Sequence, residues 1–416
     1  MFPIVDLTIM VIKSIISVFI NPLFWVVLFL VYSQYKRSSR LEEKMLGKSK
    51  YSVKDRVVSS ALTGLLGGII GSAVMVVVGV TLDNTGIIYV WIIAILLMMI
   101  NPRYMCFSYA GGIVSLASLI FGYPSIDVSA LMSIVAILHL VESVLIYFNG
   151  SKHSIPVFME DKRYGVVGGY NLVRFWPIPI IIMTAVTGQI IPGETIPMPD
   201  WWPMLKAMGL EGKPDDVIYL MLPVVAALGY SDIAITETPE RKSRDSAVKL
   251  LGYSITLLII SVLSSYQKPL QWVAAVVGPL MHELLIIASR KTQKQGKPLY
   301  LAADNGIRVL DVLPGSPAEK MGIKRGDILH RINGKEIANE ADIGDILNYY
   351  PTYMWVDAVT VKGERTTYEF TQYPVGVGKL GVLVVPRDGD VPVAAMEVLS
   401  PLKRWIRRFR NTQDDE

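Results

Sequence analysis

The sequence predicts an α-helical polytopic membrane protein with a small β-rich domain near its C-terminal end. Of the 416 residues, 52% are hydrophobic and only 18% are charged, which is outside the range of ordinary soluble domains. The charges gather in blocks between long apolar runs, as in helical membrane proteins rather than β-barrels. Strand and turn signals are concentrated after residue 300.

Apolar runs of about 20 residues, the length that a ~30 Å hydrocarbon core requires, mark the expected membrane spans. The first run, 3–35, is interrupted at Asn21-Pro22 and is either one kinked span or an interfacial helix followed by a short span. The others are expected at 57–81, 86–100, 105–122, 128–148, 171–191, 217–235, 248–266 and 270–289. Residues 1–290 are therefore expected to form a multi-span domain of about eight to nine helices.

Basic residues occupy every second loop between these spans, which predicts an orientation. Lys and Arg recur at 36–56, at Arg103, and at 152–163, 241–249 and 290–297, whereas the alternate loops hold few of them. Loops rich in Lys and Arg stay on the cytoplasmic side. We therefore expect the C-terminal domain in the cytoplasm, against the inner leaflet.

Two further features narrow the class of protein. The first residues, MFPIVDLTIM, lack a basic region followed by a small-residue cleavage site, so no removable signal peptide is expected. Cys106 is the only cysteine, so the chain cannot form an internal disulfide.

Local signals divide the β-rich domain, residues 295–385, into short elements. Ser316 suits the N-cap of a short helix that starts at Pro317 and ends at Gly322. Asn333-Gly334 suits a type I′ hairpin turn. Strands are expected at 307–312, 328–332 and 381–385, with a return strand from 335 and a helix over 340–349.

The segment 306–337 resembles a PDZ domain of the bacterial kind, in which the words PGSPA, GI, GD and ING follow in this order. PDZ domains bind a peptide as an added strand at a sheet edge and commonly hold its terminal carboxylate in backbone amides. The resemblance implies a carboxylate loop at 300–305, although the familiar GLGF word is absent, and a pairing strand at 306–310. The implied peptide-binding residues are Tyr300, Leu301, Gly306, Ile307, Arg308, Val309, Leu310, Ile343, Ile346 and Leu347.

Titratable groups inside apolar spans are costly and suggest function; here they are His139, Glu142, Asp232, His282 and Glu283. His282-Glu283 opens a word like the HExxH of zinc metalloproteases, but Ile286 replaces the second histidine. His139 and Glu142 share a helical face and complete a metal site only if their helix touches His282. We expect hydrogen bonds between packed helices instead, with no metal, no cofactor and no catalytic residue.

The tail, residues 386–416, contains the basic and aromatic segment LKRWIRRFR at 402–410. On the cytoplasmic face, anionic lipid would attract it by roughly 1 kcal/mol per basic residue. A solvated tail is the alternative. Nucleic acid is not an expected partner, because no folded basic surface accompanies the segment.

The whole plan of spans, PDZ-like module and basic tail resembles the MinJ family of division-topology proteins in Gram-positive bacteria. The resemblance rests on NPLFWVVLFLVY near the start, RYGVVGGYNLVRFWPIP at 163–179, LGYSDIAITETPERK at 228–242 and GPLMHELLI at 278–286. It implies a non-enzymatic scaffold in the cell membrane, at septum and poles. Its implied partners are division-site proteins, namely a DivIVA-type coiled-coil protein and the MinD ATPase of the Min system.

Intramembrane site-2 metalloproteases, which also join PDZ modules to membrane spans, provide the alternative function. The incomplete HExxH word, the absence of a later Leu-Asp-Gly word and the position of the module after the last span count against an active protease. A degenerate relative of such a protease remains open. A transporter is a third possibility, but no paired Pro- or Gly-broken half-repeats stand out.

Overall fold

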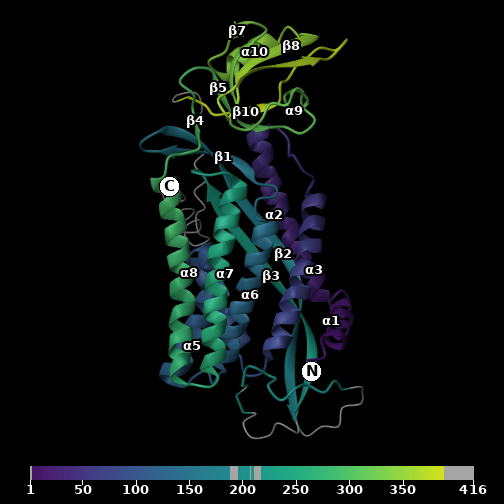
Figure 1. The fold of residues 1–416 in the computed structure, drawn as a ribbon, viewed down its shortest axis with the longest axis vertical. Coiled ribbons are helices and arrows are strands. Elements are labelled where there is room, and N and C mark those ends of the chain that lie inside the picture. The colour runs from purple at the N-terminus through teal and green to yellow at the C-terminus, as the bar shows by residue number, and fades with distance from the viewer. Residues whose placement is uncertain (1, 188–194, 207, 210–216, 388–416) are drawn as a thin grey trace, which may run out of the picture.

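The computed structural model describes residues 2–187, 195–206, 208–209 and 217–387. A helical bundle runs along the long axis of the molecule, and a β-rich domain covers one end of it (Figure 1). The N-terminus lies toward the opposite end (Figure 1). The bundle helices are α1 (Ile4–Val18), α2 (Pro22–Leu46), α3 (Val53–Val78), α4 (Ile87–Ile100), α5 (Phe107–Phe121), α6 (Val128–Asn149), α7 (Pro239–Ser264) and α8 (Pro269–Gln295).

Four helices, α3, α6, α7 and α8, are long and apolar enough to cross a bilayer, and the bent pair α1–α2 would make a fifth span. The predicted break at Asn21-Pro22 is confirmed: the pair bends by 72°, and the Asn21 side chain caps α2. Along α8 the exposed apolar side chains recur every three or four residues, a stripe that suits contact with lipid. They are Val273, Val276, Leu280, Leu284 and Ile287. The predicted helical membrane fold class is confirmed.

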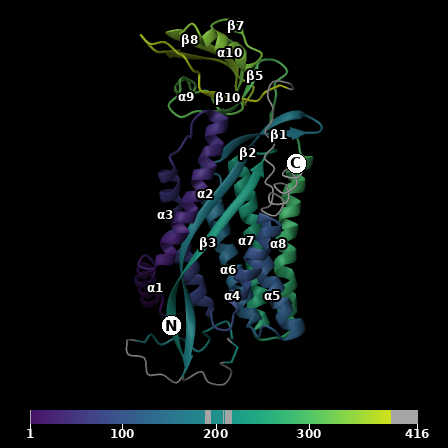
Figure 2. The ribbon, with the colours of Figure 1, turned by 180° about the vertical axis from the view of Figure 1, so that it is seen from behind.

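Two of the predicted spans are wrong in type. Residues 171–191 and 217–235 were expected as helices, but they contribute strands β2 (Gly165–Thr187) and β3 (Val217–Ala234). These strands pair without interruption from Tyr170↔Ala234 to Thr187↔Val217 and run beside the helices (Figure 2). Pro177 and Pro179 explain the error, because two prolines inside a helix would each remove a hydrogen bond and clash with the preceding turn.

The edge of β2 that faces α3 is arranged to leave few backbone N–H groups unbonded. The amide of Phe175 donates to the Tyr35 hydroxyl at 3.1 Å, and that of Ile181 donates to Ser72 Oγ at 2.8 Å. At the two intervening positions on the same edge, Pro177 and Pro179, there is no N–H at all. An apolar bundle can therefore accommodate this sheet edge, since unpaired backbone groups there would be costly.

Glycines on α3 allow this helix to approach the strand closely. A Cβ atom at Gly64 would lie 2.1 Å from the carbonyl oxygen of Pro177, and one at Gly68 would lie 2.0 Å from that of Pro179. Neither position has room for a side chain. The small residues of α3 thus serve helix–strand packing along β2.

The spans predicted at 86–100 and 105–122 form two short helices, α4 and α5, of 14 and 15 residues. At 1.5 Å per residue each is roughly 22 Å long, which is less than a ~30 Å hydrocarbon core. The start of α4 lies beside the start of α6, because Asp127 N donates to Asn84 O at 2.7 Å. The pair is therefore a helical hairpin whose tip, residues 101–106, points into the bundle. Arg103 lies in this tip, so its predicted place in a basic surface loop is wrong.

The other basic segments gather at the end of the bundle that meets the β-rich domain. The end of α2, the start of α3, the start of α7 and the end of α8 all lie there (Figure 1). Strand β1 (Ile155–Asp161) pairs with β2 at this end, as does β4 (Tyr300–Leu301). The charge asymmetry of the sequence thus corresponds to two distinct ends of the molecule.

The C-terminal domain has the predicted elements. Its sheet has the order β10-β5-β6-β8-β9, with β7 paired to β6. Ser316 caps α9, and Gly322 ends it with φ of 88°. Asn333 and Gly334 have φ values of 50° and 77°, as a type I′ turn requires. The elements are β5 (Ile307–Val312), α9 (Pro317–Met321), β6 (Ile328–Ile332), β7 (Lys335–Glu336), α10 (Glu340–Leu347), β8 (Tyr353–Val359), β9 (Arg365–Thr371) and β10 (Val382–Val384).

Candidate functional site

The strand expected to accept a peptide, at 306–310, is an interior strand. Its β5 segment pairs with β6 through Ile307↔Leu329 and with β10 through Val384↔Val309. Both edges are therefore occupied by the chain itself. Most of the predicted peptide-binding side chains in β5 and α10 contribute to the domain core, namely Ile307, Val309, Ile343, Ile346 and Leu347. Leu310 is also buried, but in the core of the bundle, next to Gly168.

The expected carboxylate loop, 300–305, contacts the bundle and two arginines. Leu301 and Tyr300 pair with β2 in the bundle. The carbonyl oxygen of Leu301 accepts from Arg308 Nε at 2.8 Å, and Arg387 Nη2 donates to the carbonyls of 303, 304 and 306 at 3.1–3.2 Å. The loop thus presents carbonyl oxygens to guanidinium groups. A carboxylate would need N–H donors instead.

Within the described part of the chain, the unpaired edge beside β5 belongs to β10. Leu313 N donates to Gly381 O, and Val385 N donates to Arg308 O, so residues 381 and 385 point their backbone groups at β5. Because backbone groups alternate along a strand, Val382 and Val384 direct theirs to the other side. The loop before β10 lies against the segment that follows α10, with Val377 N bonded to Pro351 O at 2.9 Å. Among the described residues, β10 therefore has one edge whose backbone groups are not paired with a strand.

The C-terminal domain is docked on the bundle through a buried charge cluster. The Asp311 carboxylate on β5 forms ion pairs with Lys50 from the α2–α3 loop and with Arg325, the latter at 2.9 Å. Burial lowers the pKa of Lys50, although the Asp311 carboxylate opposes this shift. The Tyr170 hydroxyl donates to the carbonyl of Leu310, and its ring lies 4.9 Å from the Arg325 guanidinium. The position of β5 is thus tied to β2.

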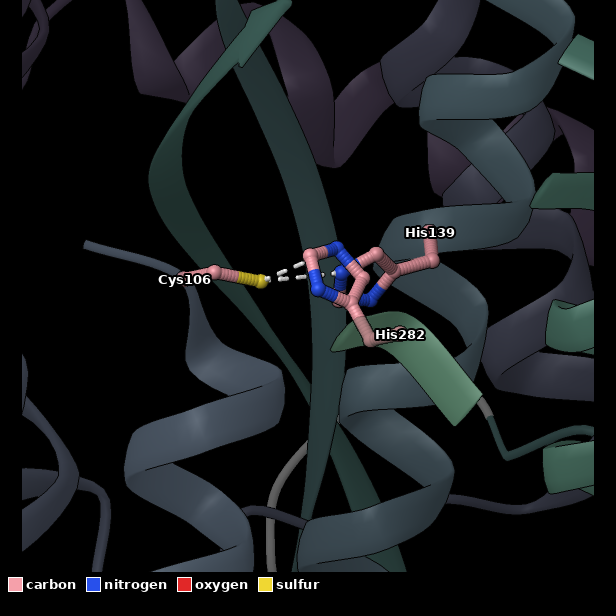
Figure 3. A group of neighbouring side chains, drawn as sticks. All are labelled: Cys106, His139 and His282. Atoms are coloured by element: carbon pink, nitrogen blue, oxygen red, sulfur yellow. Dashed lines mark hydrogen bonds between the residues drawn. The ribbon is translucent and has the colours of Figure 1, made fainter. Parts of the chain in front are cut away.

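Three side chains converge at the tip of the α4–α5 hairpin (Figure 3). Cys106 Sγ lies 3.1 Å from His139 Nε2 on α6 and 3.7 Å from His282 Nε2 on α8. His139 Nδ1 donates to the carbonyl of Val135 at 2.7 Å. The predicted meeting of His139 and His282 therefore occurs, and Cys106 joins them.

The neighbouring acidic groups behave differently from one another. Glu283 on α8 forms an ion pair with Arg103 and accepts a hydrogen bond from the Tyr109 hydroxyl. Glu142 lies one turn after His139 on α6, and within the described residues it has no ion pair or hydrogen bond. Ile286, where a zinc protease would have its second histidine, is on α8 one turn after His282.

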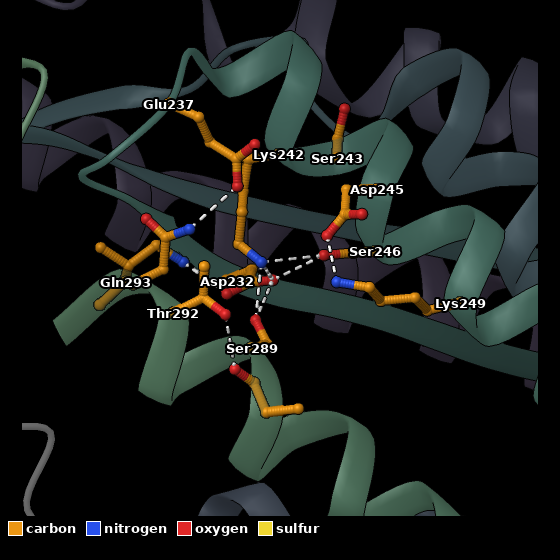
Figure 4. Close-up of polar contacts among 12 residues, drawn as sticks. Asp232, Glu237, Lys242, Ser243, Asp245, Ser246, Lys249, Ser289, Thr292 and Gln293 are labelled. Atoms are coloured by element: carbon orange, nitrogen blue, oxygen red, sulfur yellow. Dashed lines mark hydrogen bonds and ion pairs between the residues drawn. The ribbon is translucent and has the colours of Figure 1, made fainter. Parts of the chain in front are cut away.

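Asp232, the remaining predicted intramembrane group, lies near the end of β3, two residues before Ala234. Its carboxylate pairs with Lys242 Nζ at 2.8 Å and accepts from Ser246 Oγ at 2.9 Å (Figure 4). On α8, Gln293 accepts from the amides of 235 and 236 and donates to Glu237. The stretch 228–242 therefore fixes the last turns of α8, which lead into the C-terminal domain.

The sequence interpretation missed Cys106, Arg103, Lys50 and Asp311 as site residues. The sequence prediction for Cys106 concerns disulfide formation alone, although a cysteine near apolar runs that hold histidines has the chemistry of a metal ligand. Asp311 interrupts the apolar run of a strand, which is a signal for a buried charge partner. Lys50 and Arg325 carry no such local signal.

Comparison with known proteins identifies two relationships. A PDZ domain family model matches residues 308–348. The "Cell division topological determinant MinJ" of Bacillus subtilis is 22% identical over 393 residues, which cover 89% of this chain and 94% of that protein. A "Probable cell division topological determinant MinJ" of Lacticaseibacillus paracasei is 22% identical over 61% of this chain and 65% of that protein.

Similarity to proteases is confined to short stretches. A "Putative protease Do-like 14" of Arabidopsis thaliana is 32% identical over 95 residues, which cover 22% of this chain and 21% of that protein. Among solved structures, one match is the PDZ domain of an SdrC-like protein from Listeria innocua, with 16% identity and a TM-score of 0.18. The match covers 20% of this chain and 97% of the Listeria chain.

Proposed function

We propose, from the premise that the chain is a MinJ-like membrane protein with a PDZ domain, that it is a non-enzymatic scaffold at division sites. In this role it holds the PDZ domain at the membrane surface and recruits division-site proteins, including the Min system and a DivIVA-type partner. Similarity to MinJ over 89% of the chain is the observation that carries the proposal.

The proposed peptide site is the outer edge of β10, next to α10. Addition of a strand there would use the outward backbone groups of Val382 and Val384 without breaking the β5–β10 pairing. This site replaces strand addition at 306–310, where β10 would first have to leave. The predicted residues Ile343, Ile346 and Leu347 then have a supporting role in the core of the PDZ domain.

The proposed orientation places the PDZ domain in the cytoplasm. Its support is the gathering of Lys and Arg at the end of the bundle that carries this domain. The chain is then a multi-pass protein whose N-terminal end lies on the outer side. The proposed attraction of the basic segment 402–410 to anionic lipid concerns residues outside the described part of the chain.

The metalloprotease alternative has weaker support from the site. The Glu283 carboxylate, which would act as general base, is engaged by Arg103 and Tyr109. The position of the second histidine is Ile286. A scaffold requires neither a general base at Glu283 nor a histidine at position 286.

A fluorescent fusion of the full-length chain, expressed in place of MinJ in Bacillus subtilis, tests the scaffold. We expect foci at septa and poles, and an even signal over the envelope would contradict the proposal. The Val382→Pro variant removes an outward N–H and should disperse the foci. The matched Val382→Thr variant keeps the N–H and should retain them, and equal behaviour of the two variants would exclude the β10 edge as the peptide site.

A further inference from the structure

The cluster at the tip of the α4–α5 hairpin has the composition and spacing of a metal site. Cys106, His139 and His282 come from three different helices, and their ligand atoms lie within 4.8 Å of one another. In a tetrahedral zinc site, with Zn–S of ~2.3 Å and Zn–N of ~2.0–2.1 Å, a sulfur and a nitrogen are separated by about 3.6 Å. The observed S···N separations of 3.1 and 3.7 Å lie on either side of this value.

The hydrogen bonding of the cluster is incomplete without a further partner. His139 donates through Nδ1 to the carbonyl of Val135, so its Nε2 carries a lone pair that faces Cys106. The Cys106 thiol has a single proton and can donate to only one of the two histidines. His282 Nδ1 is buried and has no hydrogen-bond partner among the described residues.

The bond from His139 to a backbone carbonyl is also the one by which a metal-ligating histidine is usually oriented. It fixes the ring and leaves Nε2 free to coordinate. The surroundings are aromatic as well: the Tyr253 ring lies 5.4 Å from the His139 ring, and the Tyr109 ring lies 5.2 Å from the His282 ring. Such a shell limits the access of water to the cluster.

The charges near the cluster suit a divalent cation. Bound zinc would hold Cys106 as a thiolate and leave one positive charge in excess. Glu142, one turn after His139, is the carboxylate available to balance it, because Glu283 is already neutralised by Arg103. A neutral cluster without a metal would leave Glu142 without an ion pair.

We propose that Cys106, His139 and His282 bind one zinc ion inside the membrane bundle, with a water molecule as the fourth ligand. The ion would join the tip of the α4–α5 hairpin to α6 and α8. It is a structural site, and it does not depend on the scaffold function proposed above.

The test uses the full-length protein in detergent, purified with a tag that contains no histidine and freed of metal by a chelator. After incubation with zinc and gel filtration, we expect about one zinc per chain by mass spectrometry of the metal. Cobalt in place of zinc should give thiolate-to-cobalt absorption, which in this chain can arise only from Cys106. Less than a tenth of an equivalent of zinc, or cobalt spectra without the thiolate band, would overturn the proposal.

Variants locate the ion. Cys106→Ser and His282→Gln should each lower zinc retention at least tenfold, whereas His330→Gln, on β6 in the PDZ domain, should retain it. Retention of zinc by Cys106→Ser and His282→Gln, or binding of copper but not zinc by the wild type, would refute the assignment.

An alkylation experiment on the wild type tests the site even if a variant fails to fold. Zinc should slow the reaction of Cys106 with a maleimide at least tenfold, and a chelator should restore the rate. An unchanged rate would reject the site.

Discussion

At the scale of single residues, the end of the bundle below the PDZ domain holds buried charged side chains, and two of them form an ion pair. Arg56 and Glu42 are 1% and 0% exposed and form an ion pair. Arg174, also fully buried, donates from Nη1 to His153 Nδ1 at 2.8 Å. Removal of Arg56 or Glu42 would leave the other charge buried and uncompensated, which is strongly destabilising. These residues therefore fix the loops on which the PDZ domain rests.

His153 gives this end of the molecule a predicted pH dependence. Burial, and then the nearby Arg174 charge, lower the pKa of His153 to about 3 from its ordinary value of 6.5. Between these two values the unfolded chain binds a proton that the folded chain does not, so stability is complete above pH 6.5 and falls as the pH decreases. Each pH unit in this window costs at most about 1.4 kcal/mol, less here because the ring is partly exposed.

Thermal unfolding of the detergent-solubilised protein between pH 6.5 and 5 measures this effect. The window lies above the ordinary pKa values of carboxyl groups. The His153→Gln variant, which cannot bind the proton, should lose much less stability than the wild type over the same range. Parallel loss of melting temperature in both proteins would show that another group is responsible.

At the scale of elements, the contact of α3 with β2 determines whether the β2–β3 ribbon can lie in the bundle. The prolines of β2 remove N–H groups from its edge, and the glycines of α3 let that edge come close. Cα–H groups facing carbonyl oxygens, as at Gly64 and Gly68, add weak stabilisation of about 0.5–1 kcal/mol each. Helix α3 and strand β2 therefore together avoid unpaired backbone N–H groups in apolar surroundings.

The Gly68→Ala substitution should separate α3 from β2. The added methyl group would lie 2.0 Å from the carbonyl oxygen of Pro179, which is backbone and cannot move aside. We expect a loss of about 1–3 kcal/mol or more, as for overpacked cores, seen as a lower melting temperature and faster proteolysis. Gly252→Ala on α7 is the control, because nothing lies within 4 Å of its Cβ position. Equal stability of the two variants would contradict the packing described here.

Elements governed by local rules were predictable from the sequence, and those governed by distant pairing were not. The cap at Ser316, the end at Gly322 and the turn at Asn333-Gly334 follow from residue type and were predicted correctly. Long apolar runs suit a buried strand as well as a membrane helix. Pro177 and Pro179 argue against a helix at 171–191, and the sequence prediction did not use them. The pairing of β10 with β5 joins segments about 70 residues apart, so the sequence does not show that β10 covers an edge of β5.

The polar groups in the bundle show the same limit. His139, Glu142, His282 and Glu283 were singled out because titratable groups are rare in apolar spans. Their contacts depend on a hairpin that turns back inside the bundle and brings Cys106 and Arg103 between α6 and α8. No pattern in the sequence distinguishes such a hairpin from two full crossings, because both consist of apolar runs with a short break.

At the scale of the whole molecule, Asp311 links the PDZ domain to the bundle. The Asp311→Asn substitution leaves Lys50 buried without a charge partner, and breaking such a pair costs about 3–5 kcal/mol in buried sites. We expect at least tenfold faster amide hydrogen exchange at 299–301, where the domain pairs with the bundle, as docking weakens.

The control for this prediction is Asp357→Asn on β8, whose carboxylate accepts a hydrogen bond from Thr367 on β9 and, among the described residues, forms no ion pair. Its exchange at 299–301 should match that of the wild type. Unchanged exchange in Asp311→Asn would show that β4–β2 pairing alone holds the domain in place.

The short connection between α8 and β4 has a further consequence. Only residues 296–299 separate the two elements, and four residues span at most about 14 Å. A PDZ domain released from the bundle would therefore stay beside it, at an effective concentration in the millimolar range. Docking that would be too weak between separate molecules is then sufficient within this chain, and a partner must compete against a tethered neighbour rather than a free one.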